Sequence, residues 1–290
     1  MNASSLPATV WERGEFRWGI KTYVMAIINA TPDSFSGDGI AGKPVLAGDL
    51  AAAAVANGAD LIDIGAESTR PGHQPINERD ELARLLPVLE AVRSRVTVPI
   101  SVDTSKAAVA DAALRAGASI VNDVCGLMRD PELASVIATH AAPVVIMHDA
   151  LPDGRGDLVT GIVRELSRRL DYALAAGIGW EHLIVDPGFG FAKDWRQNLE
   201  LLRRLGELRV LDRPILTGTS RKGTIGRVLG LVEQDRTEGT AATVTLAIAA
   251  GADMVRVHDV QAMVRVARMT DAVIRGLPGG PPALSGESER

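Results

Sequence analysis

The stretch Leu183–Lys193 joins a short apolar run to an acid, a turn and a cation. The run Leu183–Val185 is typical of a strand buried on both faces, and it stops at Asp186. A Pro-Gly pair then breaks the strand, and the aromatic Phe191 and the basic Lys193 follow. An ordinary loop that begins with a capping Asp would also fit this stretch. A functional role for this stretch is favoured because other apolar runs in the chain also end in a polar residue of a chemically useful type.

Three of these strand-end residues are hydrogen-bonding groups of one kind. Asp103, Asn122 and Asp186 are two acids and an amide. A carboxylate that accepts two parallel N–H bonds is strong and directional, so this set could hold a heterocycle with several N–H donors on one edge, such as an aminopyrimidinone. The polar residues collected at the predicted strand ends are Asn29, Asp63, Glu67, Asp103, Asn122, His148, Asp186, Ser220, Arg221, Lys222, Arg256 and His258.

A second set is rich in cations, although the chain carries a net charge of −5. Concentrated positive charge suits a phosphate or diphosphate. Asn29 offers a neutral oxygen that could bind Mg²⁺ while phosphates supply the other ligands. Together the two sets predict a polar heterocycle that carries a diphosphate leaving group. The cationic set comprises Arg70, Arg221, Lys222, Arg256 and His258.

Structural roles compete with these functional ones. Asp63 and Glu67 could be ordinary polar residues of the rim, and Arg221 could simply pair with a carboxylate there. His148 could be a packed histidine beside Met147, which would line the pocket. The single cysteine, Cys125, lies in an apolar context, so we expect a buried small residue rather than a nucleophile.

Composition favours a large aliphatic core. Of the 290 residues 46% are hydrophobic and only 3% are aromatic, which suits parallel strands covered by helices. The negative net charge argues against a nucleic-acid partner. A lone cysteine fits a reducing compartment, and we find neither a signal peptide nor an apolar run long enough for a bilayer. We therefore expect a cytoplasmic protein with no membrane partner.

Eight apolar runs alternate with helical segments, which predicts a single-domain (β/α)₈ TIM barrel rather than an open doubly wound sheet. No Gly-x-Gly-x-x-Gly follows the first run, and a barrel would gather all the strand-end residues at one mouth. We expect an N-terminal arm over 1–20, the barrel over 21–276 and a disordered tail over 277–290. The predicted strands are Tyr23–Asn29, Leu61–Gly65, Val98–Asp103, Ile120–Val124, Pro143–His148, Leu183–Asp186, Pro214–Gly218 and Met254–His258.

Long ordered motifs give the chain a family resemblance. It resembles the dihydropteroate synthase family of pterin-binding transferases across about Val24–Ile274. The family is a (β/α)₈ barrel that joins 6-hydroxymethyl-7,8-dihydropterin diphosphate to p-aminobenzoate in folate biosynthesis and releases diphosphate. The resemblance also implies Mg²⁺, a homodimer and inhibition by sulfonamides. The matching segments are Met25–Ser36, Asp63–Gly72, Ser101–Thr104, Val121–Val124, Met147–His148, Asp186–Phe191 with Lys193, Ser220–Lys222 and Arg256–Val260.

The resemblance also implies roles for individual residues. The pterin would be held by Asp103, Asn122, Met147, Asp186 and Lys222, and the diphosphate by Asn29, Thr69, Arg70, Arg256 and His258, with Asn29 also at the Mg²⁺. The p-aminobenzoate would lie among Pro71, Phe191, Ser220, Arg221, Lys222 and Gly223. Asp103, Lys222, Arg256 and His258 would be catalytic, and loops around Asp33, Phe35 and Thr69–Pro71 would close over the site.

One departure from the family pattern concerns Gly223, which stands where members usually carry a small hydroxyl residue. Two alternatives remain open. A methyltetrahydrofolate:corrinoid methyltransferase would keep the Asp/Asn set without needing a diphosphate site. A non-catalytic paralogue would bind a pterin without turnover.

Overall fold

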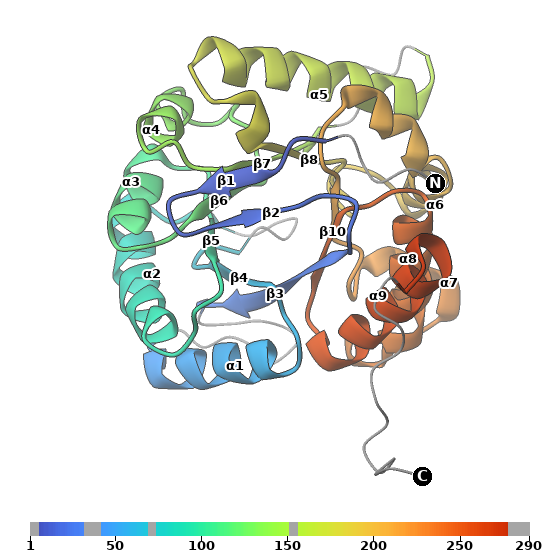
Figure 1. The fold of residues 1–290 in the computed structure, drawn as a ribbon, viewed down its shortest axis with the longest axis horizontal. Coiled ribbons are helices and arrows are strands. Elements are labelled where there is room, and N and C mark those ends of the chain that lie inside the picture. Colours follow the sequence, from blue (N-terminus) through green and yellow to red (C-terminus); the bar gives the residue numbers. More distant parts are fainter. Residues whose placement is uncertain (1–5, 32–41, 69–73, 151–155, 278–290) are drawn as a thin grey trace.

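The structure is a computed structural model that describes residues 6–31, 42–68, 74–150 and 156–277. It is an eight-stranded parallel barrel within a ring of helices, as predicted, and it forms a single domain (Figure 1). The strands of the barrel are β3 (Tyr23–Asn29), β4 (Leu61–Gly65), β5 (Ile100–Asp103), β6 (Ile120–Asp123), β7 (Val144–Met147), β8 (Leu183–Asp186), β9 (Leu216–Thr217) and β10 (Met254–Val257).

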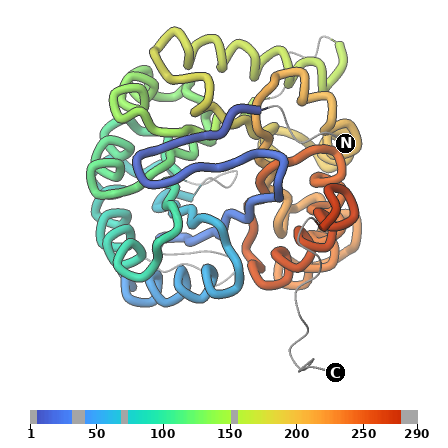
Figure 2. Tube along the Cα trace, viewed as in Figure 1, coloured from blue at the N-terminus to red at the C-terminus, as the bar shows by residue number. Residues whose placement is uncertain are grey.

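Parallel pairing runs around the whole barrel. Strand β10 pairs with β3, so the last strand of the barrel lies beside the first, and Figure 2 shows the two segments together. Strands β8 and β9 meet through the bridge between Val185 and Ile215. A closed barrel brings the carboxyl ends of all its strands to one mouth.

Helices follow the strands and cover the outside of the barrel. They are α1 (Pro44–Ala56), α2 (Glu78–Arg93), α3 (Ala107–Arg115), α4 (Leu133–Thr139), α5 (Leu158–Ala175), α6 (Trp195–Arg203), α7 (Gly223–Leu229), α8 (Thr237–Ala249) and α9 (Val260–Arg275), with the short 3₁₀ segments η1 (Trp180–His182), η2 (Leu205–Leu211) and η3 (Glu233–Asp235). No helix of the described residues is both long and apolar enough to cross a bilayer.

Several predicted boundaries were wrong for local reasons. Strand β6 ends at Asp123 instead of Val124, because the Asp123 carboxylate accepts the backbone N–H groups of Cys125 and Leu127 and turns the chain. Helix α1 begins at Pro44, since proline suits the first turn of a helix. Residues 195–211 form two elements, α6 and η2, instead of one continuous helix. Helix α7 begins at Gly223, although a Gly-rich sequence usually favours a loop.

The pleat of the strands divides the barrel interior into layers. Side chains at alternate positions point inward, so Met25, Leu61, Ile120 and Met254 form an apolar layer at the amino ends of the strands. Two residues further along three of these strands, the inward positions hold Asp63, Asn122 and Arg256. The same period thus gives the barrel an apolar base and a polar mouth.

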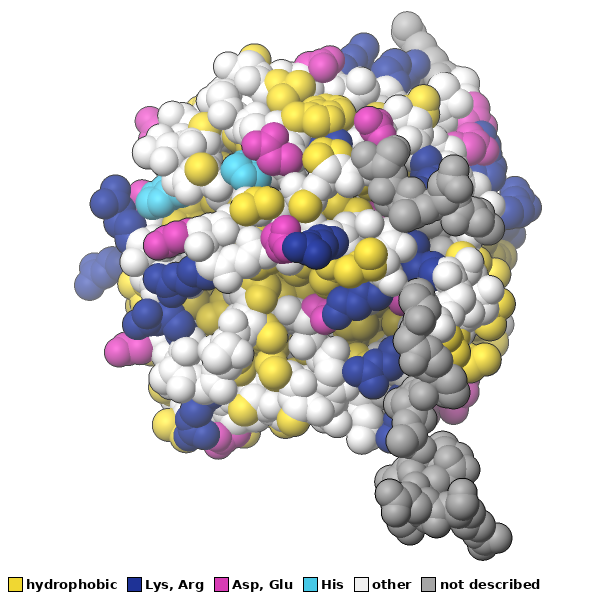
Figure 3. Space-filling model, in the orientation of Figure 1, with side chains coloured by type: hydrophobic (Ala, Val, Ile, Leu, Met, Phe, Trp, Pro, Cys, Tyr) yellow, Lys and Arg dark blue, Asp and Glu magenta, His cyan; other side chains and the backbone are white. Residues whose placement is uncertain are grey.

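An antiparallel hairpin of β1 (Thr9–Trp11) and β2 (Gly14–Phe16) covers the apolar base. The rings of Phe16 and Trp18 pack into the same cluster as the apolar layer. Figure 3 shows this face, where charged and apolar side chains are interspersed. The hairpin therefore lies at the end of the barrel opposite the mouth.

Candidate functional site

The carboxyl ends of the strands surround a cavity of about 540 Å³. This volume is within the range of sites for small molecules. Every predicted site residue that the structure describes lines it: Asn29, Asp103, Asn122, Met147, Asp186, Phe191, Ser220, Arg221, Lys222, Gly223, Arg256 and His258. The other predicted residues, Asp33, Phe35, Thr69, Arg70 and Pro71, lie outside the described residues.

An ion-pair network forms the floor of the cavity. Arg256 donates from Nε to Asp63 Oδ2 at 2.6 Å and from Nη2 to Asp103 Oδ2 at 3.1 Å. Asn122 Nδ2 donates to the same Asp63 oxygen at 3.2 Å. Asp63 is 0% exposed. It is thus the anchor of Arg256 rather than a solvated rim residue.

Burial governs the titration of the two carboxyl groups that line the cavity, Asp103 and Asp186. Burial raises the pKa of Asp103 to about 8; Arg256 opposes this rise and the Asp63 carboxylate adds to it. Burial also raises the pKa of Asp186 to about 6, against the opposing hydrogen bond from the Gly188 N–H and the positive charge of Lys222. For Arg256, burial would lower the pKa, but the carboxylates of Asp63 and Asp103 outweigh it and the pKa is raised.

The floor also holds acceptor atoms that its own side chains do not satisfy. Asp103 Oδ1 and Asp63 Oδ1 are buried and accept no hydrogen bond from any described residue. A buried polar atom without a partner is costly, so such oxygens favour a ligand that brings N–H donors. Asp103 faces the cavity and can receive them.

The outer half of the cavity is built from loops. Lys222 Nζ lies 4.3 Å from the centre of the Phe191 ring, a cation–π contact. The Ser220 hydroxyl is 3.0 Å from His258 Nδ1, so the two strand ends are joined. Arg221 donates to both carboxylate oxygens of Asp259, at 3.0 Å from Nε and 2.5 Å from Nη2. The alternative of a rim ion pair is therefore confirmed for Arg221.

Lys193 and His148, which belong to the sequence motifs, have structural roles. Lys193 Nζ donates to three backbone carbonyls, those of His148, Gly188 and Phe191, and so holds the loop after β8. His148 is 0% exposed, and burial lowers its pKa to about 3. This agrees with the packed histidine that the sequence allowed.

Glu67 is not an ordinary rim residue, and Cys125 is not fully buried. The Lys106 ammonium pairs with both Glu67 and Glu81, so Glu67 belongs to a buried ion cluster at the edge of the cavity. Burial would raise the pKa of Glu67, but the Lys106 contact overcomes it and the pKa is lowered. Cys125 lies beyond the end of β6 and is half-buried, whereas we had expected it to be buried. Burial raises its thiol pKa, which disfavours a nucleophile.

The chain offers little for a metal ion by itself. Among the residues that the structure describes, no group of three His, Cys, Asp or Glu side chains could hold one. Asn29 is half-buried and lines the same cavity as Arg256 and His258. Its amide oxygen fits Mg²⁺ only if a phosphorylated ligand and water supply the remaining oxygens, which is a usual arrangement for this ion.

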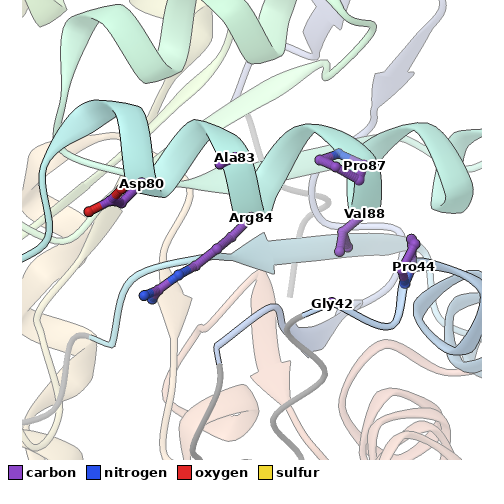
Figure 4. A pocket seen from close by; sticks show the side chains of 7 residues that line it. All are labelled: Gly42, Pro44, Asp80, Ala83, Arg84, Pro87 and Val88. Atoms are coloured by element: carbon purple, nitrogen blue, oxygen red, sulfur yellow. The ribbon is translucent and has the colours of Figure 1, made fainter.

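A second hollow lies outside the barrel, between α1 and α2 (Figure 4). Arg84 and Asp80 of α2 line it together with Pro44 of α1, and Pro87 and Val88 add apolar surface. Among the described residues, its lining includes no side chain from the carboxyl ends of the strands. These lining residues offer neither the N–H acceptors nor the concentration of cations found in the main cavity.

Sequence reasoning missed several residues of the outer cavity. Asn198 stands inside α6, and asparagine in a helix interior is unfavourable unless its side chain has a task, which was a usable signal. The remaining ones lie on segments read as loop or surface, where no pattern marks them. The missed lining residues on α6, on α7 and around η3 are Trp195, Asn198, Thr224, Arg227, Glu233 and Arg236.

Comparison with known proteins settles the family. The model of the pterin-binding enzymes matches residues 25–258. The chain belongs to the pterin-binding enzyme family. A curated relative named dihydropteroate synthase, from Bacillus subtilis, is 46% identical over 254 residues, which cover 88% of this chain and 89% of that protein. Another of the same name, from Synechocystis, is 45% identical over 269 residues, covering 90% and 93%.

Solved structures of this pterin-binding family superpose on the whole barrel. The dihydropteroate synthase of Clostridium difficile, determined in the presence of pteroic acid, has a TM-score of 0.86 at 46% identity and covers 90% of this chain and 99% of its own. The Xanthomonas albilineans enzyme with 4-aminobenzoic acid has a TM-score of 0.85 at 37% identity, covering 94% and 100%. The barrel fold is therefore shared with enzymes of this family.

Proposed function

We propose that the chain is a dihydropteroate synthase, a transferase of folate biosynthesis. It condenses 6-hydroxymethyl-7,8-dihydropterin diphosphate with p-aminobenzoate to 7,8-dihydropteroate and diphosphate. The observation that carries the proposal is one cavity with N–H acceptors at its floor and cations at its side. The names of the relatives, at 45–46% identity over nearly the whole chain, support the same activity.

The floor of the cavity suits the pterin. Asp103, Asn122 and Asp186 supply acceptors to the amino and ring N–H donors along one edge of the bicycle. Asp103 Oδ1, unsatisfied within the described chain, gains a donor when that edge arrives. Met147 and Lys222 line the walls beside the ring.

The diphosphate is proposed to lie near Arg256, His258 and Asn29. Asp63 and Asp103 already orient Arg256, and the Ser220 hydroxyl orients His258. These side chains therefore lose little conformational freedom when the diphosphate binds. Thr69 and Arg70 remain predicted members of this subsite. Mg²⁺, bound through Asn29 and the phosphate oxygens, would supply charge neutralisation of the leaving group.

The p-aminobenzoate is proposed to lie in the outer half, against Phe191 and Lys222. Ser220, Arg221, Gly223 and the predicted Pro71 complete this side. The aniline nitrogen would then face the pterin methylene carbon from the open side of the cavity. Sulfonamides, which resemble p-aminobenzoate, would compete for the same place.

The chemistry asks the chain to stabilise separated charge. The C–O bond between the pterin methylene and the diphosphate breaks, and its electron pair leaves with the diphosphate, close to Arg256. The carbocation is delocalised into the electron-rich pterin, and the ionised Asp103 at its edge balances the positive charge. The aniline nitrogen then attacks the methylene carbon and loses a proton, which the departed diphosphate can accept. Loops around Asp33, Phe35 and Thr69–Pro71 are proposed to exclude water during these steps.

Two further properties stay predictions, a cytoplasmic location and a homodimer. Exposed apolar side chains on helices late in the barrel support the dimer, and light scattering measures it. They are Val228 at 52%, Leu229 at 50%, Leu246 at 57%, Met269 at 66% and Val273 at 73% exposure.

Diphosphate release by the purified protein with Mg²⁺ and dihydropterin diphosphate tests the activity. Release that requires p-aminobenzoate is expected. Binding of the pterin without release would identify a non-catalytic paralogue. Pterin binding that is indifferent to the diphosphate, with methyl transfer from methyltetrahydrofolate, would indicate the methyltransferase type.

A further inference from the structure

One buried amide ties the loop after β8 to the start of α6. Asn198 is 4% exposed and uses both ends of its side chain. Its Oδ1 accepts the backbone N–H of Gly190 at 2.8 Å. Its Nδ2 donates to the carbonyls of Lys193, at 3.0 Å, and Asp194, at 2.7 Å. A side chain with this many buried partners fixes the loop geometry, because losing it would leave several polar groups unpaired.

At Gly190 the backbone of this loop lies close to the Lys222 side chain. Gly190 has φ +76°, and a Cβ added there would meet Lys222 Cδ at 2.8 Å. The next residue, Phe191, carries the ring that lies 4.3 Å from Lys222 Nζ. The hydrogen bond from Gly190 to Asn198 therefore holds the backbone from which Phe191 reaches its place against Lys222.

We propose that Asn198 is a positioning residue for the aniline substrate, acting through Gly190 and Phe191. This rests on the proposed function, and it assigns substrate affinity to a residue behind the loop. Asn198 sets the place of Phe191 against Lys222, and these two side chains together form the wall on which the p-aminobenzoate ring packs. The pterin floor is fixed independently by Asp63, Asp103 and Arg256, so Asn198 affects one substrate and not the other.

The test is the pair of KM values in Asn198→Ala. The KM for p-aminobenzoate should rise about tenfold, the size expected for one buried hydrogen bond, while the KM for dihydropterin diphosphate should change less than about twofold. Gln197→Ala is the matched control. Its Oε1 accepts the Asp194 N–H in the capping box at the same helix start, without contact to Gly190, so both KM values should stay unchanged. An equal rise of both KM values in Asn198→Ala would overturn the proposal.

A double variant decides whether the effect passes through Phe191. If it does, Asn198→Ala combined with Phe191→Leu should raise the KM for p-aminobenzoate no further than Phe191→Leu alone. If instead the two substitutions raise the KM for p-aminobenzoate by factors that multiply, the effect of Asn198 does not pass through Phe191. Should Asn198→Ala fail to fold, Asn198→Asp keeps an acceptor for the Gly190 N–H, and the KM for p-aminobenzoate should then stay within about threefold of the unmodified value; a selective tenfold rise would contradict the route through Gly190. Failure of the proposed function appears separately, as absence of p-aminobenzoate-dependent diphosphate release in the unmodified protein.

Discussion

The two halves of the cavity are held in different ways. In the deep half, side chains from strands bind one another through charge, as Arg256 does with Asp63 and Asp103. In the outer half, loop segments are held by single side-chain contacts, as Arg221 with Asp259, and by bonds from a side chain to the backbone, as Asn198 holds Gly190. A charged network on rigid strands favours a fixed heterocycle, whereas a loop wall can adjust to variation in a second substrate. We therefore expect changes in the deep half to cost turnover and pterin binding, and changes in the outer half to alter affinity for p-aminobenzoate.

The largest expected effect is at the floor. Asp103→Asn and Arg256→Ala should each reduce kcat/KM by about 10²-fold or more, because each removes charge that the transition state requires. Steady-state diphosphate release measures the loss. Asp111→Asn is the matched control: Asp111 pairs with Arg115 and His140 on the outside of α3, and its loss should leave turnover unchanged. Wild-type turnover in either floor variant would disprove the site assignment.

The next largest effect is the dependence of pterin affinity on pH. N–H donors of the pterin favour the ionised Asp103, so binding lowers its pKa and releases a proton. Because the pKa in the free protein is raised to about 8, affinity for the pterin should increase as pH rises toward 8 and level off above it. Asp186, with a pKa of about 6, should add to the slope only below pH 6. Titration calorimetry in buffers of different ionisation enthalpy at pH 7 should detect the released proton; an affinity that is flat from pH 6 to 9 would rule out this coupling.

Asp63→Asn should move this pH window. The amide keeps the shape of Asp63 but removes the carboxylate that shares Arg256, so Arg256 is left to Asp103 and the pKa of Asp103 falls. The plateau of pterin affinity should therefore begin at lower pH than in the unmodified protein, with a moderate loss of kcat/KM from a less constrained Arg256, about tenfold. An unchanged window would mean that Asp63 does not act on Asp103.

A smaller effect is expected in the outer half from Gly223→Ser. Gly223 is exposed, and a Cβ added there would meet no other atom within 4 Å, so the serine side chain has room. A hydroxyl there can donate to the substrate carboxylate, and the KM for p-aminobenzoate should fall about threefold, as one exposed hydrogen bond allows. The KM for dihydropterin diphosphate is the internal control. A raised KM for p-aminobenzoate would show that Gly223 does not face that substrate.

The smallest effect is expected from Cys125→Ala. Burial raises the thiol pKa, and Cys125 is not among the residues that line the cavity. Turnover should remain within about twofold of the unmodified protein. Complete inactivation by this change would reveal a role that neither half of the cavity explains.

The difference between the halves also marks what the sequence could predict. Strand residues repeat with period two, so Asp103, Asn122 and Asp186 could be placed at one mouth from their position at the ends of apolar runs. Asp63 was harder to interpret, because its partner Arg256 lies 193 residues away and only the closed barrel brings them together. The outer half depends on loop conformation. No periodicity marks Asn198, the turn at Gly190 or the start of α7 at Gly223.

Equilibrium binding of dihydropterin diphosphate tests the division between the two halves most directly. The unmodified protein, Asp103→Asn and Phe191→Leu are compared at pH 8. We predict that Asp103→Asn weakens binding about 10²-fold, as expected for a lost charged partner, and that Phe191→Leu changes it less than about threefold. Equal losses in the two variants would contradict the account, since the pterin would then depend on both halves alike.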